Sequence, residues 1–111
     1  MSFNQESNQV SVRVDIIRLV DESNPGWVEC RLVDAHGKTW LFREKAPVVC
    51  GEYLDTSSSY PQKGSVACRV LSRSRKPDGQ EIVSVDTSET WGIESTEGVT
   101  EFDVLVDQLI Q

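Results

Sequence analysis

Hydrophobic and polar residues alternate most regularly on either side of the short segment 34–37. The flanking segments 27–33 and 38–43 are rich in β-branched and aromatic residues, and such residues favour β-strands. Gly37 suits the left-handed position that ends a three-residue loop, and a loop of that length fixes how the two strands pair. The pattern therefore predicts a β-hairpin, in which the opposite pairs are Leu32 with Trp40, Cys30 with Phe42, and Glu29 with Arg43.

Burial selects the same register of this hairpin as the turn does. One face of the hairpin is charged and the other is apolar. A shift of the pairing by one residue would move Trp40 and Phe42 onto the charged face, where they would lose their burial. The apolar face consists of Val28, Cys30, Leu32, Trp40 and Phe42, and the charged face carries Glu29, Arg31 and Arg43.

The segment before this hairpin is predicted to form a long, bent strand. Apolar and polar residues alternate over residues 10–16. The apolar positions then change parity to Ile17 and Leu19, as a β-bulge or bend near residues 16 and 17 would require. Segment 21–26 has the composition of a turn and leads into the hairpin.

A second hairpin is predicted from segments 65–73 and 80–86. The connection contains Pro77, which suits the first position of a turn, and Gly79, which suits the left-handed position. The same three-residue loop then fixes the register. The predicted opposite pairs are Arg75 with Glu81, Arg73 with Val83, and Leu71 with Val85.

Segment 44–64, between the two hairpins, lacks the periodicity of a strand. Pro47 interrupts any continuing strand. A short helix starting there is disfavoured, because Val48 and Val49 lose side-chain freedom in a helix and Gly51 costs about 1 kcal/mol relative to alanine. The segment is therefore predicted to be an irregular crossover.

The tail contains a third predicted hairpin, with its turn at residues 97–98. The apolar residues between 102 and 110 also fit helical spacing. We therefore predict a strand through about Leu105, followed by a helical turn. The predicted pairs in this hairpin are Ile93 with Phe102 and Trp91 with Val104.

In its order of elements, the chain resembles an oligonucleotide/oligosaccharide-binding (OB) barrel. The resemblance covers roughly residues 10–86 and rests on element order alone. It implies a mainly β fold, a small antiparallel barrel of six or seven strands formed by one domain over residues 10–111. An SH3-like barrel or a small β-sandwich fits the same pattern. The predicted core consists of Val12, Val14, Val28, Cys30, Leu32, Trp40, Phe42, Val66, Cys68, Val70 and Val85.

The composition is that of a single cytoplasmic domain. A chain of 111 residues, 38% hydrophobic and 26% charged, has the size and balance of one globular domain. Residues 1–9 are polar and aperiodic, so they are predicted to be a disordered start. No apolar run approaches the roughly 20 residues of a membrane helix. The N-terminus also lacks the basic and apolar regions of a signal peptide.

The reactive side chains give no catalytic motif. Cys30, Cys50 and Cys68 are an odd number without metal or redox spacing, and we expect reduced thiols that pack as small hydrophobic groups. The single histidine, His36, lies at a turn with no Ser or Cys at motif spacing, and the chain lacks a glycine-rich phosphate loop. The sequence predicts a non-enzymatic protein without metal or cofactor.

Charge is unevenly distributed along the chain. Segment 63–76 holds five of the eleven basic residues and no acid, whereas segment 78–107 holds nine of the eighteen acids and no base. In an OB-like barrel the hairpin tip with Arg73, Arg75 and Lys76 would border the ligand groove. The net charge of −7 and the lack of aromatic residues in the basic segment argue against nucleic acid.

The leading hypothesis is therefore a protein-interaction module whose acidic segment 78–107 contacts a basic protein partner. A specific form is a bacterial immunity or antitoxin protein that covers a basic nuclease. The alternative is a ligand-binding barrel, because segment 46–63 is long for a plain connection. Tyr53 and Tyr60 would line one side of its pocket and Trp27 the other.

Overall fold

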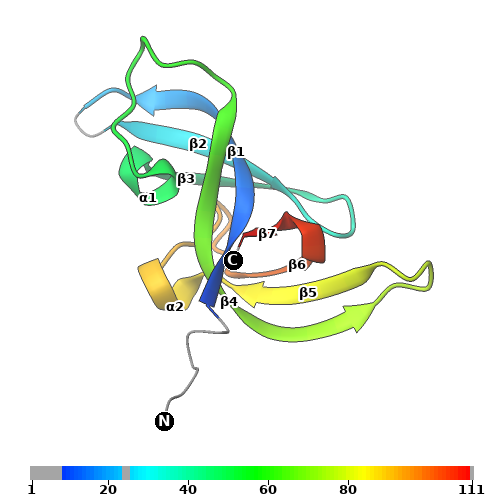
Figure 1. The fold of residues 1–111 in the computed structure, drawn as a ribbon. Helices are drawn as coiled ribbons and strands as arrows, with labels where there is room; N and C mark the ends of the chain where they lie inside the picture. The colour runs from blue at the N-terminus through cyan, green and yellow to red at the C-terminus, as the bar shows by residue number, and fades with distance from the viewer. Residues whose placement is uncertain (1–8, 24–25, 111) are drawn as a thin grey trace.

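The protein folds into one curled, half-barrel sheet of antiparallel strands (Figure 1). The computed structural model describes residues 9–23 and 26–110. The strands are β1 (Gln9–Asp21), β2 (Trp27–Val33), β3 (Thr39–Lys45), β4 (Gln62–Arg75), β5 (Glu81–Asp86), β6 (Glu101–Leu105) and β7 (Leu109–Ile110). They lie in the order β3-β2-β1-β4-β5-β6, with β7 beside β1. The predicted mainly β, small-barrel class is confirmed.

Two long strands, β1 and β4, run side by side through the middle of the molecule (Figure 1). The pairing of β1 with β2 shifts register between Ile16 and Arg18, which confirms the predicted bulge, and shifts again between Leu19 and Asp21. Each bulge increases the local bend of the strand. β1 can therefore pair with β4 along its first half and with β2 along its second. Residues 1–8, predicted to be disordered, lie outside the described residues, and Gln9 already belongs to β1.

The first hairpin, β2–β3, forms in the predicted register. Leu32 lies opposite Trp40, and the other two predicted pairs are also present. Gly37 has the left-handed backbone conformation, with a φ of 83°. The Asp34 N–H donates to the Lys38 carbonyl at 2.9 Å and closes the three-residue loop. Turn chemistry and burial together therefore specified this element.

The second hairpin, β4–β5, differs from the prediction at one position. Arg75 lies opposite Glu81 and Arg73 opposite Val83, as predicted, but Val70 rather than Leu71 lies opposite Val85. A register shift between Val70 and Ser72 leaves Leu71 as the extra residue, with 41% of its surface exposed. The bulge preserves the contact of Val70 with the core. The predicted pairing of Leu71 with Val85 was wrong for this reason.

The crossover contains a helix, α1 (Ala46–Cys50), where an irregular segment was predicted. Pro47 lies in its first turn, and Gly51 ends it in the left-handed conformation with its N–H donating to the Pro47 carbonyl at 3.0 Å. Ala46 and Val49 are buried. Burial of apolar surface, at about 25 cal/mol per Å², outweighs the weak helix propensity.

Gly64 of β4 allows α1 to pack this closely. A Cβ atom at that position would lie 2.9 Å from the Ile16 side chain and 3.0 Å from the Val49 carbonyl oxygen. A side chain at this position would therefore have to displace the end of the Ile16 side chain and push the α1 backbone away. The absence of a side chain at residue 64 therefore brings α1, β1 and β4 together.

The predicted third hairpin was wrong, although the strand and helical turn that end the chain are present. Residues 88–91 form a short helix, α2 (Ser88–Trp91), and β6 pairs with β5 so that Phe102 lies opposite Val85. A 3₁₀ turn, η2 (Val106–Gln108), follows β6. Buried Thr87 redirects the chain, since its hydroxyl donates to the Ile93 carbonyl at 2.7 Å. Segment 93–99 becomes a loop instead of a strand.

Phe102 joins the two ends of the sheet. Its ring centre lies 5.3 Å from that of Trp40 in an edge-to-face arrangement and 5.5 Å from that of Phe42. Two backbone bonds of 2.8 Å support this closure, from Thr96 N–H to the Leu41 carbonyl and from Ala35 N–H to the Asp103 carbonyl. No pair of β-strands bridges β3 and β6 in the described residues, so side-chain packing is the main link between them.

The core agrees with the predicted set, and only two of its members are half-buried rather than buried. These are Trp40 and Val70, which pack against the edge of the core. The indole N–H of Trp40 donates to the Asp34 carboxylate at 2.9 Å, which holds that ring at the rim of the barrel. No helix in the described residues has the length and apolar character needed to cross a membrane.

Replacing Phe102 by alanine is expected to lower the free energy of unfolding by about 3 to 5 kcal/mol, because it removes a buried aromatic ring and leaves a cavity. Urea unfolding followed by fluorescence measures this. The control is Val106→Ala at a 41% exposed position, expected to change stability by less than about 0.5 kcal/mol. Equal effects of the two substitutions would contradict the closure described here.

Candidate functional site

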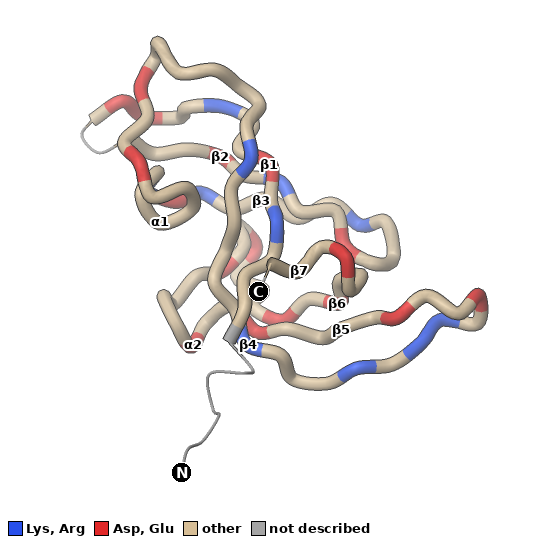
Figure 2. The backbone as a smooth tube through the Cα atoms, viewed as in Figure 1, with Lys and Arg blue, Asp and Glu red and all other residues tan. Residues whose placement is uncertain are grey.

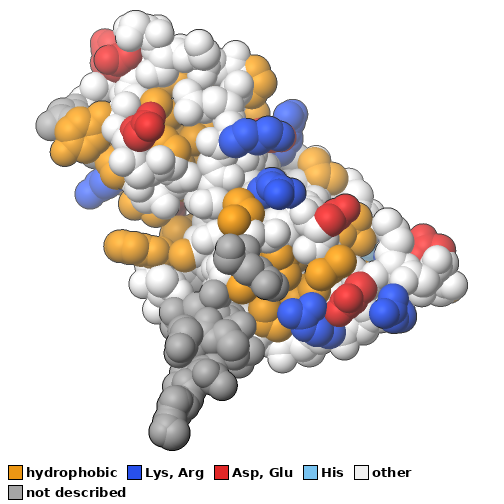
Figure 3. All heavy atoms as spheres, viewed as in Figure 1, with side chains coloured by type: hydrophobic (Ala, Val, Ile, Leu, Met, Phe, Trp, Pro, Cys, Tyr) orange, Lys and Arg blue, Asp and Glu red, His pale blue; other side chains and the backbone are white. Residues whose placement is uncertain are grey.

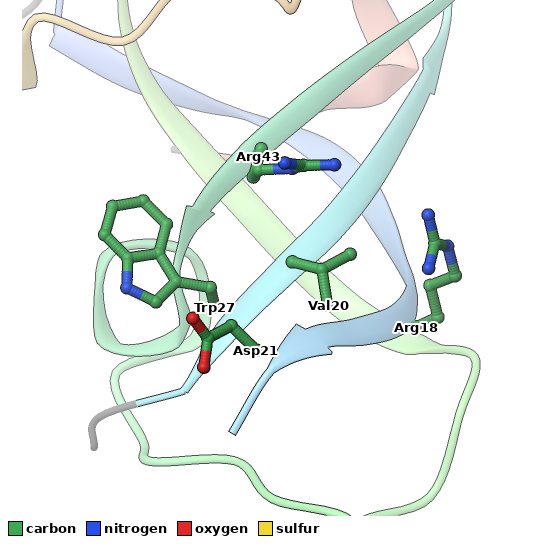
Figure 4. A pocket seen from close by; sticks show the side chains of 5 residues that line it. All are labelled: Arg18, Val20, Asp21, Trp27 and Arg43. Carbon is green, nitrogen blue, oxygen red and sulfur yellow. The ribbon is translucent and has the colours of Figure 1, made fainter. Parts of the chain in front are cut away.

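Trp27 lies at the start of β2 and lines a hollow of the surface. This hollow has a volume of about 370 Å³ and lies on the outer face of β1, β2 and β3 (Figure 4). The side chain of Trp27 is half-buried. The hollow is lined by Arg18, Val20, Asp21, Trp27 and Arg43.

The two tyrosines predicted to share a pocket with Trp27 lie elsewhere. Tyr53 is 71% exposed. Tyr60 packs against the core and donates its hydroxyl to the Asp55 carbonyl at 3.1 Å. Neither tyrosine lines the hollow beside Trp27. The concavity at Trp27 is therefore built by strands, and the crossover loop does not form its wall.

The basic hairpin tip is bonded to its own surroundings. Arg73 pairs with Glu81 at 3.1 Å, and Arg75 donates to the Gly79 carbonyl at 2.8 Å. Lys76 donates to the Ala35 carbonyl at 3.3 Å. Figure 2 shows basic segments of β4 running beside acidic segments of β5. On the face in Figure 3, basic and acidic side chains alternate around apolar ones.

Carboxylates gather where the two ends of the sheet meet. We call this surface the acidic seam, and it consists of Asp34, Glu44, Glu94, Glu101 and Asp103. Three of them, Asp34, Glu101 and Asp103, line a hollow of about 310 Å³ together with His36, Trp40, Ser84 and Phe102. The closure of the sheet therefore brings acids of the β2–β3 hairpin beside acids of the tail.

Asp103 is the centre of a hydrogen-bond network in this hollow. Its Oδ1 accepts the Ser84 hydroxyl at 2.6 Å, and its Oδ2 lies 3.0 Å from His36 Nε2. The bond from Ser84, followed by that from His36, holds the pKa of Asp103 below its usual value. A nucleophilic serine needs its hydroxyl bonded to a base such as imidazole. Here the Asp103 carboxylate lies between Ser84 and His36, so the serine hydroxyl has no imidazole partner. The network instead holds the loop of the β2–β3 hairpin, which carries His36, against β6.

Like charges crowd one end of the acidic seam. Burial, and secondly the negative charge of Glu94, raise the pKa of Glu44. Burial also opposes ionisation of Asp34, but hydrogen bonds from the Trp40 side chain and from the Lys38 and His36 backbone outweigh it and lower its pKa. The seam therefore keeps Asp34 ionised and disfavours the charge on Glu44.

The two buried cysteines are not activated thiols. Cys30 and Cys68 are buried free thiols, and burial raises the pKa of each to about 12. Thiolates are the nucleophilic form, so neither is activated near neutral pH. The described residues contain no group of three His, Cys, Asp or Glu side chains that could hold a metal ion.

Sequence reasoning did not anticipate the meeting of His36, Ser84 and Asp103. Ser84 lies opposite Asp103 in the β5–β6 pairing, whereas the predicted tail hairpin paired β6 with residues 91–93 instead. Alternation along segment 81–86 was the available signal, because it places Ser84 on the polar face between Val83 and Val85. Comparison of the chain with protein-family models, curated proteins and solved structures found no match.

Replacing Asp103 by asparagine is expected to lower the free energy of unfolding at pH 7 by roughly 1 kcal/mol, the typical loss for a weakened bond to a charged group. The pKa of Asp103 is lower in the folded state. Its contribution is therefore complete above the ordinary carboxyl pKa and is lost as pH falls through the folded value. The difference between wild type and variant should shrink below about pH 4.

Urea unfolding from pH 7 to pH 3 measures this dependence. The control is Asp107→Asn, at an exposed position just after β6, which should track the wild type at every pH. A difference that stays constant to pH 3 would show that Asp103 does not stabilise the closure through its charge.

Proposed function

We propose that the protein is a non-enzymatic, cytoplasmic interaction module of bacterial type whose acidic seam binds a basic protein partner. The observation that carries the proposal is the gathering of acids from separate segments along the closure. Asp34, Glu101 and Asp103 line one hollow, and Glu44 lies near enough to Glu94 for that charge to add to the rise in pKa that burial causes. Charges held this close are unfavourable for the isolated chain, and a cationic partner would relieve the repulsion.

The hollow in the seam offers more than charge to such a partner. Trp40 forms one wall, and the Lys38 ammonium lies 4.5 Å from the centre of its ring. A cation over an indole is stabilised by the ring's negative face. An arginine or lysine of the partner could take this place between the ring and the carboxylates of Glu101 and Asp103. The narrower hypothesis of an immunity or antitoxin protein is one case of this binding mode.

Among the described residues, the side chains of Ser84, Cys30 and Cys68 are not activated as nucleophiles, and this supports the non-enzymatic part of the proposal. Ser84 donates to the Asp103 carboxylate instead of to an imidazole, and the Cys30 and Cys68 thiols are protonated near neutral pH. Binding therefore accounts for the arrangement of the seam without a chemical step.

Reversing two seam charges is expected to abolish retention of a basic partner. In a pull-down from the native cell at physiological salt, wild type should retain a basic protein that Glu94→Lys/Glu101→Lys does not. Association with the purified partner should slow at least about tenfold in that variant, because steering by charge accelerates encounter by 10- to 1,000-fold.

The matched control is Glu22→Lys/Glu52→Lys, which changes the net charge equally at exposed positions outside the seam. It should retain the partner. Equal loss in both double variants would show that total charge, not the seam, matters. Retention by both would refute the seam as the binding surface.

A further inference from the structure

The hollow beside Trp27 is formed by a bend in β1. The register shift between Leu19 and Asp21 leaves Val20 as the extra residue of a bulge. Val20 lies in the middle of the hollow, between Trp27 and Arg18 (Figure 4). The bulge thus opens the outer face of three paired strands into a concavity of about 370 Å³. Volumes of 300 to 1,000 Å³ are typical of small-molecule sites.

One end of this hollow carries two guanidinium groups. Arg18 is held by Glu29 at 2.6 Å, and the Glu29 side chain is only 14% exposed. Strand pairing places Arg43 on the other side of Glu29. No carboxylate oxygen of the described residues lies within 4.0 Å of the Arg43 guanidinium. Glu29 therefore orients Arg18, while Arg43 beside it adds a positive charge that no carboxylate of the described residues contacts.

The other end of the hollow combines an aromatic ring with a carboxylate. Figure 4 shows Asp21 beside Trp27, away from Arg18. The Asp21 carboxylate accepts the Ser23 N–H at 2.9 Å, which fixes it at the rim. The Lys45 ammonium lies 5.6 Å from the centre of the Trp27 ring. The hollow is therefore polar along its length, with the Asp21 carboxylate and the Lys45 ammonium at the aromatic end and two guanidinium groups at the other.

We propose that this hollow binds a nucleotide, with its base on the Trp27 indole and its phosphate between Arg18 and Arg43. A nucleobase has a stackable face and N–H donors on its edge, which match Trp27 and Asp21. A phosphate accepts several charge-assisted hydrogen bonds, which guanidinium groups supply in a planar fork. The site lies on the face of β3 opposite the acidic seam, so it does not depend on the proposed function.

The nucleotide could be a free mononucleotide or part of a single-stranded nucleic acid. A second hollow on the same face of the sheet distinguishes these two ligands. That hollow, of about 210 Å³, is lined by Arg13, Asp15, Arg31 and Lys63 among other residues. Arg31 and Lys63 lie on either side of Asp15 in neighbouring strands. Further phosphates of a single strand would meet these cations, whereas a mononucleotide would reach only the hollow beside Trp27.

Isothermal titration of the full chain with AMP, GMP and a single-stranded octadeoxynucleotide tests the proposal at 50 and 150 mM NaCl. Trp27→Leu should weaken binding at least about fivefold, since stacking on an aromatic side chain contributes this much per base or more. Arg43→Gln should also weaken binding at least about fivefold, because it removes a charge-assisted hydrogen bond to the phosphate. The matched controls are Trp91→Leu, at a 64% exposed tryptophan, and Arg75→Gln in the hairpin tip. Both should bind like wild type.

Lys63→Gln identifies the source of the nucleotide. Weaker octanucleotide binding with unchanged mononucleotide binding indicates a single strand, whereas mononucleotide binding alone indicates a free nucleotide.

Absence of binding by all three probes at 50 mM NaCl would overturn the proposal. Equal weakening in the control variants would overturn it too, because it would reveal a diffuse charge effect without a site. Arg43 is exposed, so its variant is expected to remain folded and circular dichroism checks this.

Discussion

The packing of Phe102 against Trp40 and Phe42 is the contact on which the closed shape depends. The two ends of the sheet, β3 and β6, belong to opposite ends of the strand order, and within the described residues no ladder of hydrogen bonds joins them. Backbone bonds from Ala35 and Thr96 cross the seam only at single points. An aromatic cluster can close a sheet in this way, because burial of apolar area is non-directional and needs no continuous register.

The closure of the sheet also brings together the acidic side chains of the seam, whose mutual repulsion opposes it. Glu44 and Glu94 approach each other only when the sheet curls, and the raised pKa of Glu44 records the cost, with burial as its larger cause. A pair of exposed like charges costs a few tenths of a kcal/mol, whereas a buried phenylalanine contributes about 1.5 to 3 kcal/mol. The aromatic contact therefore prevails over the repulsion, and the seam remains closed with its negative charge concentrated at the surface.

The sequence predicted elements whose register follows from local turn chemistry, and missed those decided by distant contacts. Gly37 and Gly79 fixed two hairpin loops, and alternation fixed most of the core. The Leu71 bulge depends on how Val70 meets the core across several strands, and the fate of segment 91–99 depends on buried Thr87. Neither is visible in a window of neighbouring residues.

Candidate sites were harder to predict for the same reason. The basic segment 63–76 was a candidate because no acid interrupts it, yet Arg73 and Arg75 bond within their own hairpin and Lys76 bonds to the loop of the β2–β3 hairpin. Trp27 was identified as a candidate from its position after a turn. Its companions in the hollow, Arg18 and Arg43, are separated along the chain and meet only through the pairing of β1, β2 and β3.

Strand β3 contributes to both proposed surfaces through its simple two-residue alternation. Trp40 and Glu44 face the seam side, and Arg43 and Lys45 face the outer hollow. A partner on the seam and a nucleotide in the hollow would therefore contact different faces of one strand and need not exclude each other. Coupling between them through β3 would require that strand to move, and Phe42 at its centre is fully buried against Phe102. The packing that closes the sheet thus also limits how far a ligand on one face of β3 can influence the other face.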